Sequence, residues 1–261
     1  MKLAIFGATG RMGLAVARLA HAAGDVQIVG GICSDTDPGV GRDIGELAGI
    51  GQLGVVTTPD IASGLLGADV VIDFSTASAV QPLLALAARQ KVAVVSGTTN
   101  IDDAAKAALD KAAQTVPVLW APNMSLGVQV LAELVEQAVR KLGLGFDVEI
   151  TEVHHRKKID SPSGTAKRLA DAARAARSEL REVHGRSGNV GARTNDEMAV
   201  YGLRGGDVIG DHTVYLFGQG ERIELTHRAS SRDLFAHGAL AAARFVAGKP
   251  AKRYTIADVL G

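Results

Sequence analysis

Short segments that are apolar throughout alternate with segments of helical periodicity in the first half of the chain, and this alternation constrains the fold most strongly. The apolar segments are LAIFG at 3–7, VQIVGGIC at 26–33, ADVVIDF at 68–74, VAVVS at 92–96 and PVLWA at 117–121. A strand that is apolar on both faces belongs to a parallel sheet with helices on both sides. The sequence therefore predicts an α/β fold with an N-terminal Rossmann-like, doubly wound parallel sheet.

Near Met124 the pattern changes to strands in which apolar and polar residues alternate. Three segments alternate in this way, at 146–155, 211–218 and 221–229. Gln219 and Gly220 separate the last two as a short hairpin turn. Alternation places one face of a strand on a core and the other toward water or a second subunit. With helices predicted at 127–141 and 234–246, we expect a second α+β domain built on a mixed or antiparallel sheet.

The composition argues against several kinds of partner. The 28 basic and 28 acidic residues of this 261-residue chain cancel, and only 4% of the residues are aromatic. The chain therefore has no global positive field for a nucleic acid or an anionic membrane, and few side chains for base stacking. One cysteine excludes an intrachain disulfide and a cysteine-based zinc site, and no segment approaches the ~20 apolar residues of a membrane helix. We expect a soluble, cytoplasmic protein without a metal.

The segment GATGRMG at 7–13 follows the first strand and opens the first helix. Its three glycines permit a tight turn whose backbone N–H groups can approach a pyrophosphate at the helix N-terminus. Such a turn can also join a strand to a helix without any ligand, but the βαβ setting favours a dinucleotide site.

Asp35, near the end of the second strand, is the candidate partner of the cofactor ribose, with a side-chain turn before Pro38 as the alternative. An aspartate at this place favours NAD over NADP, but no arginine follows immediately, so the choice between NADH and NADPH stays open. We interpret the neighbouring Cys33 as a small buried residue rather than a nucleophile.

Two polar segments, SGTTN at 96–100 and APNMS at 121–125, come directly after apolar strands. They fall at the carboxyl edge of the predicted sheet, where open parallel sheets bind ligands. We expect them to line the nicotinamide end of the cofactor, although capping of the following helices is an alternative role.

A basic segment, EVHHRKKIDSPSGTA at 152–166, contains two histidines and three consecutive cations. Strand alternation would place His154 and His155 on opposite faces. A core could not bury the cations without anions, and a helix opening at Gly164 and Thr165 offers N–H groups to a carboxylate. These donors favour a small polyanion as ligand. The alternative is a solvated loop that pairs with acids of the chain itself, such as Glu149, Glu152 or Asp160.

A cationic pocket beside a hydride donor predicts a reductase, because the cations make a conjugated imine or carbonyl accept hydride more readily. The reduced product then needs a proton. Lys158 is the candidate donor because the adjacent Arg156 and Lys157 favour release of its proton, and a histidine can shuttle protons near neutral pH.

The chain resembles the 4-hydroxy-tetrahydrodipicolinate reductase (dihydrodipicolinate reductase) family of lysine and diaminopimelate biosynthesis. The resemblance covers almost the whole chain and rests on GATGRMG, DFST, SGTT, APNMS, EVHHRKKIDSPSGTA, LRGGDVIGDHTV and RIELTHRASSRDLFAHGA, in the family's order. It implies reduction of 4-hydroxy-tetrahydrodipicolinate, a small dicarboxylate, to tetrahydrodipicolinate by NADH or NADPH with loss of water. It also implies a dinucleotide-binding domain at 1–125 plus 234–261 and a substrate-binding, tetramer-forming domain at 126–233.

The resemblance also assigns residues. His154 matches the family's proton donor or acceptor and Lys158 its proton donor, and the substrate contacts are His155, Gly164 and Thr165. The implied cofactor contacts are Gly7, Ala8, Thr9, Gly10, Arg11, Met12, Gly97, Thr98, Thr99, Ala121, Pro122, Asn123 and Met124.

Two departures from the family's pattern matter. Ser34 and Asp35 stand where many members have glutamate followed by arginine, so a cofactor preference does not carry over. Met124 replaces a frequent phenylalanine near the nicotinamide. Two other functions remain open alternatives, namely another Rossmann amino-acid or semialdehyde dehydrogenase and a non-catalytic NAD(P)H-binding sensor.

Overall fold

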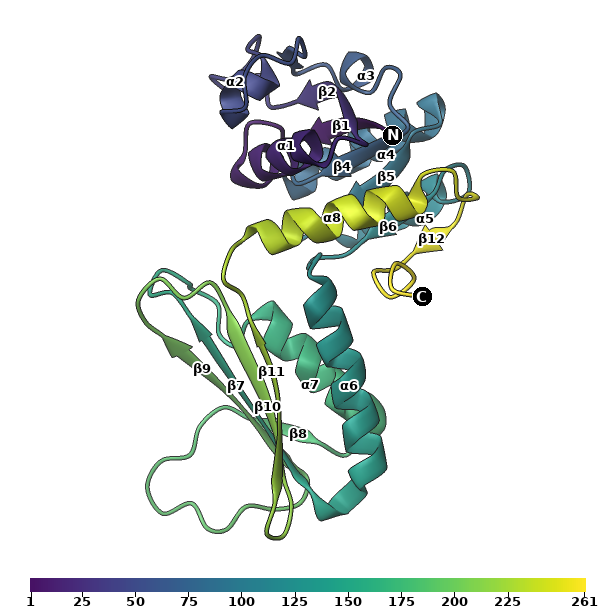
Figure 1. Ribbon diagram of the computed structural model, residues 1–261. Coiled ribbons are helices and arrows are strands. Elements are labelled where there is room, and N and C mark those ends of the chain that lie inside the picture. Colours follow the sequence, from purple (N-terminus) through teal and green to yellow (C-terminus); the bar gives the residue numbers. More distant parts are fainter. The chain divides into compact units, whose positions relative to one another are not determined.

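The computed structural model describes residues 1–261 and divides into two compact units (Figure 1). Unit 1 consists of Met1–Ser125 and Asp233–Gly261, and unit 2 of Leu126–Arg232. The first division falls where the hydrophobic pattern of the sequence changes, and the second falls at the start of the last helix. No helix combines the length and the apolar character needed to cross a membrane.

Unit 1 contains a seven-stranded sheet whose strand pairs are all parallel. The spatial order is β12-β6-β5-β4-β1-β2-β3. The chain runs outward from β1 to β3 and then returns to the other side of β1 to add the remaining strands, so the direction reverses between β1 and β4. The strands are β1 Lys2–Phe6, β2 Gln27–Ile32, β3 Thr57–Thr58, β4 Val70–Asp73, β5 Ala93–Ser96, β6 Val118–Trp120 and β12 Arg253–Tyr254.

Helices cover both faces of this sheet, with α1 and α8 on one side and α4 and α5 on the other (Figure 1). All residues of β4 and β5 are buried as a result, which explains their continuously apolar sequences. The doubly wound prediction is confirmed. The helices of unit 1 are α1 Arg11–Ala23, α2 Ile44–Ala48, α3 Ile61–Gly64, α4 Ala77–Gln90, α5 Asp103–Ala112 and α8 Asp233–Val246.

Unit 2 contains a five-stranded mixed sheet in the order β11-β10-β7-β9-β8. The pairs β7–β9 and β8–β9 are parallel, whereas β10 is antiparallel to both β7 and β11. The mixed sheet and the β10–β11 hairpin are therefore as predicted. The strands are β7 Asp147–His154, β8 Arg181–Val183, β9 Glu197–Arg204, β10 Asp211–Phe217 and β11 Arg222–Arg228.

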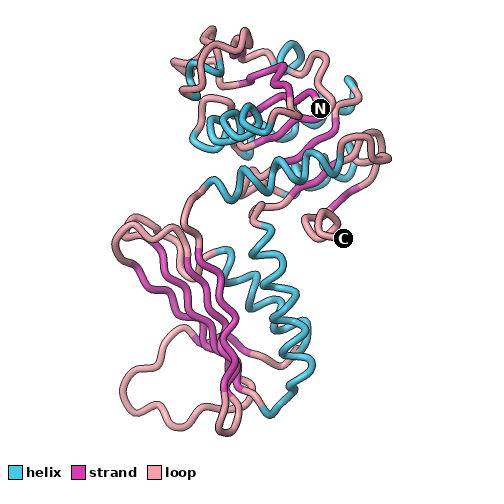
Figure 2. The backbone as a smooth tube through the Cα atoms, viewed as in Figure 1, coloured by secondary structure: helices cyan, strands magenta, loops and turns pink.

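Two helices, α6 Leu126–Leu142 and α7 Gly164–Ala176, pack together against one face of this sheet (Figure 2). Every second residue of β7 is buried, beginning with Val148 and Ile150, and these side chains form the core beneath the helices. The alternating sequence therefore arises because only one face of the sheet is covered by helices. A short 3-10 turn, Gly143–Gly145, connects α6 to β7.

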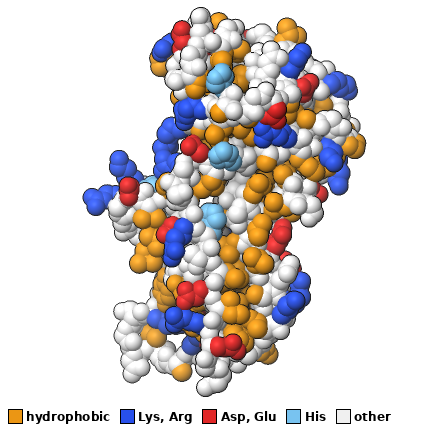
Figure 3. Space-filling view, in the orientation of Figure 1, with side chains coloured by type: hydrophobic (Ala, Val, Ile, Leu, Met, Phe, Trp, Pro, Cys, Tyr) orange, Lys and Arg blue, Asp and Glu red, His pale blue; other side chains and the backbone are white.

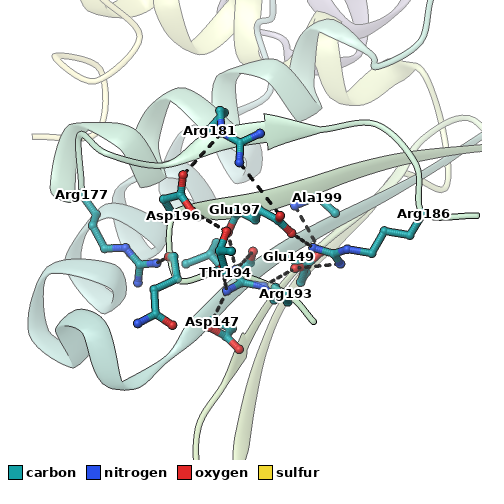
Figure 4. Close-up of polar contacts among 12 residues, drawn as sticks. Asp147, Glu149, Arg177, Arg181, Arg186, Arg193, Thr194, Asp196, Glu197 and Ala199 are labelled. Carbon is teal, nitrogen blue, oxygen red and sulfur yellow. Dashed lines mark hydrogen bonds and ion pairs between the residues drawn. The ribbon is translucent and has the colours of Figure 1, made fainter. Parts of the chain in front are cut away.

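Ion pairs hold the ends of the loop between β8 and β9 (Figure 4). Arg193 donates to Asp147 over 2.5 Å and to Glu149 over 2.8 Å, which joins the loop to the first residues of β7. Arg186 donates to Glu197 over 2.5 Å at the start of β9. The segment has little regular secondary structure, and these contacts determine where it leaves and rejoins the sheet.

Candidate active site

The glycine loop after β1 has the geometry of a dinucleotide-binding turn. Gly7 has a φ of +78°, and a Cβ at this residue would lie 2.5 Å from the carbonyl oxygen of Phe74. A Cβ on Gly13 would lie 2.2 Å from the carbonyl oxygen of Gly7. Backbone crowding therefore requires glycine at both ends of the motif, which brings α1 close to the strand edge.

The start of α1 offers N–H groups to an anion. Gly10 is the N-cap residue, and no side chain caps the helix there. The first turn of a helix has N–H groups without intrahelical partners, and its dipole favours negative charge. The turn lies at the carboxyl end of β1, beside the point where the strand order reverses, which is the usual ligand position in such sheets. These residues fit the pyrophosphate of a dinucleotide.

The two predicted polar segments, after β5 and β6, lie along the same sheet edge as the loop after β4. Asp73 is fully buried and accepts hydrogen bonds from Ser96 Oγ at 2.6 Å, Thr98 Oγ1 at 2.9 Å and the Ser75 amide at 2.9 Å. Trp120 Nε1 donates to the Thr98 carbonyl at 2.9 Å. Asp73 therefore joins the loop after β4 to the predicted segment at 96–100, a role that was not predicted from the sequence.

Glycine at 97 and the buried Met124 show how tightly this edge is packed. A Cβ on Gly97 would lie 2.2 Å from the ring of Phe74. Met124 is 1% exposed, and a Cβ on Gly238 of α8 would lie 1.7 Å from its carbonyl oxygen. The edge therefore brings together the predicted cofactor residues Gly7 to Met12, Gly97 to Thr99 and Ala121 to Met124.

The acidic residue in contact with the glycine loop is Asp37. Its Oδ2 accepts from Thr9 Oγ1 at 2.7 Å, and its Oδ1 accepts from the Gly39 amide at 2.7 Å across Pro38. The side-chain turn considered for Asp35 is thus made two residues later. Asp35 itself lies exposed in the turn after β2.

The thiol of Cys33 follows its predicted structural role. It is buried and free, and burial together with the charge of Asp37 raises its pKa. A raised pKa disfavours the nucleophilic thiolate.

A buried polar cluster lies at the carboxyl end of β7 in unit 2. Glu152 is fully buried and accepts from both terminal nitrogens of Arg204, each at 2.8 Å. Its Oε2 lies 2.5 Å from His154 Nδ1, and its Oε1 accepts from the Ser163 amide at 3.1 Å. Ser163 Oγ in turn lies 3.0 Å from His212 Nε2.

The charge states within this cluster follow from the balance between burial and hydrogen bonding. Burial raises the pKa of Glu152, but hydrogen bonds from Arg204 and His154 outweigh it, so the pKa is lowered overall. Burial lowers the pKa of His154, and the contact with Glu152 offsets only part of this effect. Burial and the neighbouring His154 lower the pKa of His212 to about 4. Near neutral pH, Glu152 is ionised and His212 is neutral.

The loop after β7 places the predicted proton donor next to a carboxylate. Lys158 Nζ donates to the two carboxylate oxygens of Asp160 at 2.7 and 2.9 Å. Arg156 and Lys157 are exposed, and blue side chains project from this end of unit 2 in Figure 3. Lys158 thus pairs with Asp160 of its own loop, as in the alternative in which the basic segment pairs with acids of the chain itself.

The other predicted substrate residues lie at the same end of unit 2. His154 is buried whereas His155 is half-buried, with His155 Nε2 3.3 Å from the Arg232 guanidinium. Gly164 and Thr165 open α7, and Ser163 is the N-cap whose hydroxyl accepts from the Ala166 amide. The structure thus brings His154, His155, Lys158, Gly164 and Thr165 to one end of the sheet.

Glu152, Arg204, Ser163 and His212 were not predicted from the sequence to be functional residues. One signal was present, because Glu152 precedes His154 by two residues and therefore shares its face of the strand. Arg204 lies on β9, His212 on β10 and Ser163 at the N-cap of α7, so their contact with Glu152 and with one another depends on the order of the strands in the sheet.

Comparisons with known proteins agree over the full length of the chain. The family model "Dihydrodipicolinate reductase, N-terminus" matches residues 1–124, and "Dihydrodipicolinate reductase, C-terminus" matches residues 127–260. A 4-hydroxy-tetrahydrodipicolinate reductase of Anaeromyxobacter sp. (strain Fw109-5) is 48% identical over 265 residues, covering 100% of this chain and 98% of the relative. A protein of the same name from Methanopyrus kandleri is 46% identical, with 98% and 95% covered.

A solved structure shares the fold of this chain. Dipicolinate-bound dihydrodipicolinate reductase from Paenisporosarcina sp. TG-14 matches with a TM-score of 0.80 at 21% identity, covering 98% of this chain and 97% of that chain. At this level of identity, the match supports the architecture described above.

Proposed function

The chain belongs to the dihydrodipicolinate reductase family, and from this membership we infer the reaction that it catalyses. It reduces 4-hydroxy-tetrahydrodipicolinate to tetrahydrodipicolinate with NADH or NADPH, releasing water, in lysine and diaminopimelate biosynthesis. The dipicolinate in the Paenisporosarcina structure supports a small dicarboxylate as the ligand class.

One observation in unit 2 carries the site assignment: the buried His154 and the start of α7 are joined through Glu152. A proton-transfer group and a carboxylate-binding helix end are therefore held together. In this assignment His154 and Lys158 are catalytic, and His155, Gly164 and Thr165 bind the substrate. The α7 N-terminus and the neighbouring cations attract the substrate carboxylates, which makes the heterocycle a better hydride acceptor.

Unit 1 is assigned the cofactor. Bound NADH or NADPH supplies the hydride, and the protein's own contribution is to fix the position of the dinucleotide. The glycine loop and the start of α1 hold the pyrophosphate. The loops that donate hydrogen bonds to Asp73 line the nicotinamide end. Asp35 remains the candidate ribose partner, and the Asp37 to Thr9 hydrogen bond fixes the loop beside it. Unit 2 is correspondingly the substrate and oligomerisation domain.

The activity is tested by a coupled assay in which pyruvate and aspartate semialdehyde are condensed to the substrate. Absorbance of NADH and of NADPH at 340 nm is followed in separate reactions. We expect substrate-dependent oxidation of at least one cofactor. Cofactor binding without turnover would support a sensor, and oxidation of aspartate or diaminopimelate with NAD would support an amino-acid dehydrogenase.

Gly164→Ala tests the substrate site with little cost to the fold. A Cβ at this residue meets nothing within 4 Å, and its φ is not in the left-handed region, so the protein's own packing does not require glycine there. Since alanine favours helix, we expect an unchanged or slightly higher Tm. The methyl group would obstruct an approaching carboxylate, and we expect KM for the substrate to rise about tenfold.

Gly185→Ala is the matched control for this substitution, because a Cβ at Gly185 also meets nothing within 4 Å. It should leave both KM and Tm unchanged. An unchanged substrate KM in Gly164→Ala would contradict the placement of the carboxylate at the start of α7.

A homotetramer is the assembly that we propose for this chain. The face of the unit 2 sheet opposite α6 and α7 carries Tyr215 stacked on Phe217 with ring centroids 5.6 Å apart. Leu203 on the same face is 52% exposed. Aromatic and apolar side chains on a sheet face that the helices leave uncovered favour a subunit interface, and the acids Asp147 and Glu149 of this face already have Arg193 as a partner. Sedimentation equilibrium should give four times the chain mass, and a monomeric mass would contradict the proposal.

The cytoplasm is the proposed location, because the reaction depends on a supply of reduced nicotinamide cofactor and the one cysteine is a free thiol. Cell fractionation that recovers the protein outside the cytoplasm would contradict it.

A further inference from the structure

We infer that Glu152 is a positioning residue that orients His154 and, through the same carboxylate, fixes the substrate-binding end of α7. The inference rests on the proposed function and deepens it. Glu152 is not placed to touch the substrate, because its side chain is fully buried. It acts through two of the three groups that donate to it, His154 Nδ1 and the Ser163 amide.

The hydrogen bond to Glu152 selects one tautomer of His154. An ionised carboxylate can only accept, so the proton between the two groups resides on Nδ1. Nε2 is then the nitrogen that exchanges a proton during turnover. A Cβ on Gly210 would lie 2.9 Å from Nε2, so glycine at this residue leaves space beside that nitrogen.

The row of residues across the sheet is built around the same carboxylate. Glu152 pairs with Gly202 of β9 on one side and with His212 of β10 on the other. A Cβ on Gly202 would lie 2.8 Å from Glu152 Oε1, so a larger side chain would displace the carboxylate. Arg204 approaches through this space and supplies the two hydrogen bonds that neutralise the buried charge.

Ser163 and His212 extend the network to α7. The Ser163 hydroxyl accepts from the Ala166 amide, which leaves its own proton for Nε2 of the neutral His212. The His212 ring packs edge-on against His154 with centroids 5.1 Å apart. The N-cap of α7 is therefore hydrogen-bonded to His212 and, through Glu152, to His154.

A purely structural ion pair is the competing interpretation. Arg204 alone would neutralise the charge of Glu152, and this requires no contact with His154 or Ser163. The carboxylate instead shares its oxygens among three donor groups, of which two belong to the proposed active site. Glu149 offers the comparison, because this acid on the same strand accepts from Arg193 and from the Ala199 amide and contacts no histidine (Figure 4).

The test compares Glu152→Gln with the matched control Glu149→Gln. For Glu152→Gln we expect kcat to fall about 100-fold, because the imidazole loses its orienting anion. Removing the negative charge also lowers the pKa of His154 further, since burial and the charges of Lys158 and Arg204 then act on the imidazole without compensation. In the profile of activity against pH, the limb that reports the ionisation of His154 therefore moves to lower pH, whether His154 acts as proton donor or as proton acceptor.

An NMR titration of the His154 ring in the free enzyme measures this pKa independently of activity. His212 and His227 face the same cluster and are titrated in the same spectra. Glu149→Gln should change Tm but leave both the His154 titration and the pH profile as in wild type. If the proposed reaction were wrong, the His154 shift would still be seen.

Glu152→Asp covers the case in which Glu152→Gln does not fold. Aspartate keeps the charge on a shorter side chain that cannot reach all three donors, so we expect a lower kcat and a smaller fall in the His154 pKa than in Glu152→Gln. A kcat within about twofold of wild type in the folded variants would overturn the positioning role. So would an identical His154 titration in Glu152→Gln.

Discussion

Lys158→Ala should lower kcat by about 1000-fold, because the reduced product loses its proton donor. The cofactor site is assigned to other residues, so the dissociation constant for NADH should stay within about twofold of wild type. Stopped-flow absorbance measures turnover, and isothermal titration calorimetry measures NADH binding. Because the Lys158 to Asp160 pair is a short-range contact of a loop, its loss should leave the Tm nearly unchanged.

Lys157→Ala is the matched control for this prediction. Lys157 is the neighbouring cation and is exposed. Its removal changes the loop charge by the same amount without removing the proposed donor, and kcat should stay within about threefold of wild type. Normal turnover in Lys158→Ala would remove this lysine from the mechanism. Equal losses in both variants would indicate a general charge effect.

Gly13→Ala should raise the dissociation constants for NADH and NADPH by about 100-fold or more. The added Cβ would lie 2.2 Å from the Gly7 carbonyl oxygen and 2.8 Å from the Ala8 Cα, and neither backbone atom can rotate away. Overpacking of this kind costs about 3 kcal/mol and moves α1 away from the loop. The fluorescence of Trp120, the single tryptophan, reports cofactor binding at the same sheet edge.

Gly10→Ala distinguishes weaker cofactor binding from loss of protein stability, which Gly13→Ala combines. Its Cβ would have one close neighbour, the Gly7 carbonyl oxygen at 3.2 Å, so the protein can accommodate it. We expect a near-normal Tm with weaker cofactor binding, because the methyl group lies where the pyrophosphate approaches. Gly13→Ala should lower both Tm and affinity. Unchanged cofactor affinity in Gly13→Ala would exclude the loop as the pyrophosphate site.

The fold of the N-terminal unit was predictable because the patterns that indicate it lie within short segments of the sequence. Continuous apolar strands such as Val70–Asp73 identify a sheet covered on both sides, and the glycines of GATGRMG mark its ligand edge. The strands β3 and β12 were not predicted, because a strand of two residues is too short to show a periodic hydrophobic pattern. Their strand structure comes from pairing with β2 and β6 at the edges of a sheet that already exists.

For the second unit, the type of sheet was predictable from the sequence, but the order of its strands was not. The alternation in β7 and the turn between β10 and β11 gave a mixed or antiparallel sheet. β9 was missed, although seven of its eight residues, Met198 to Arg204, pair with β7. That pairing determines which cation meets Glu152, and no pattern within either strand specifies it.

Sequence alone determined the class of fold, the candidate ligand edge of the first sheet and the basic segment with its two histidines, because each depends on residues close together in the chain. Tertiary structure decided which charges are paired. It brought Asp37 rather than Asp35 to the glycine loop and joined Arg204 to Glu152 across 52 positions of sequence. The physical reason is that a buried charge is stabilised only by a partner within a few ångströms, and strand order rather than sequence spacing supplies that partner.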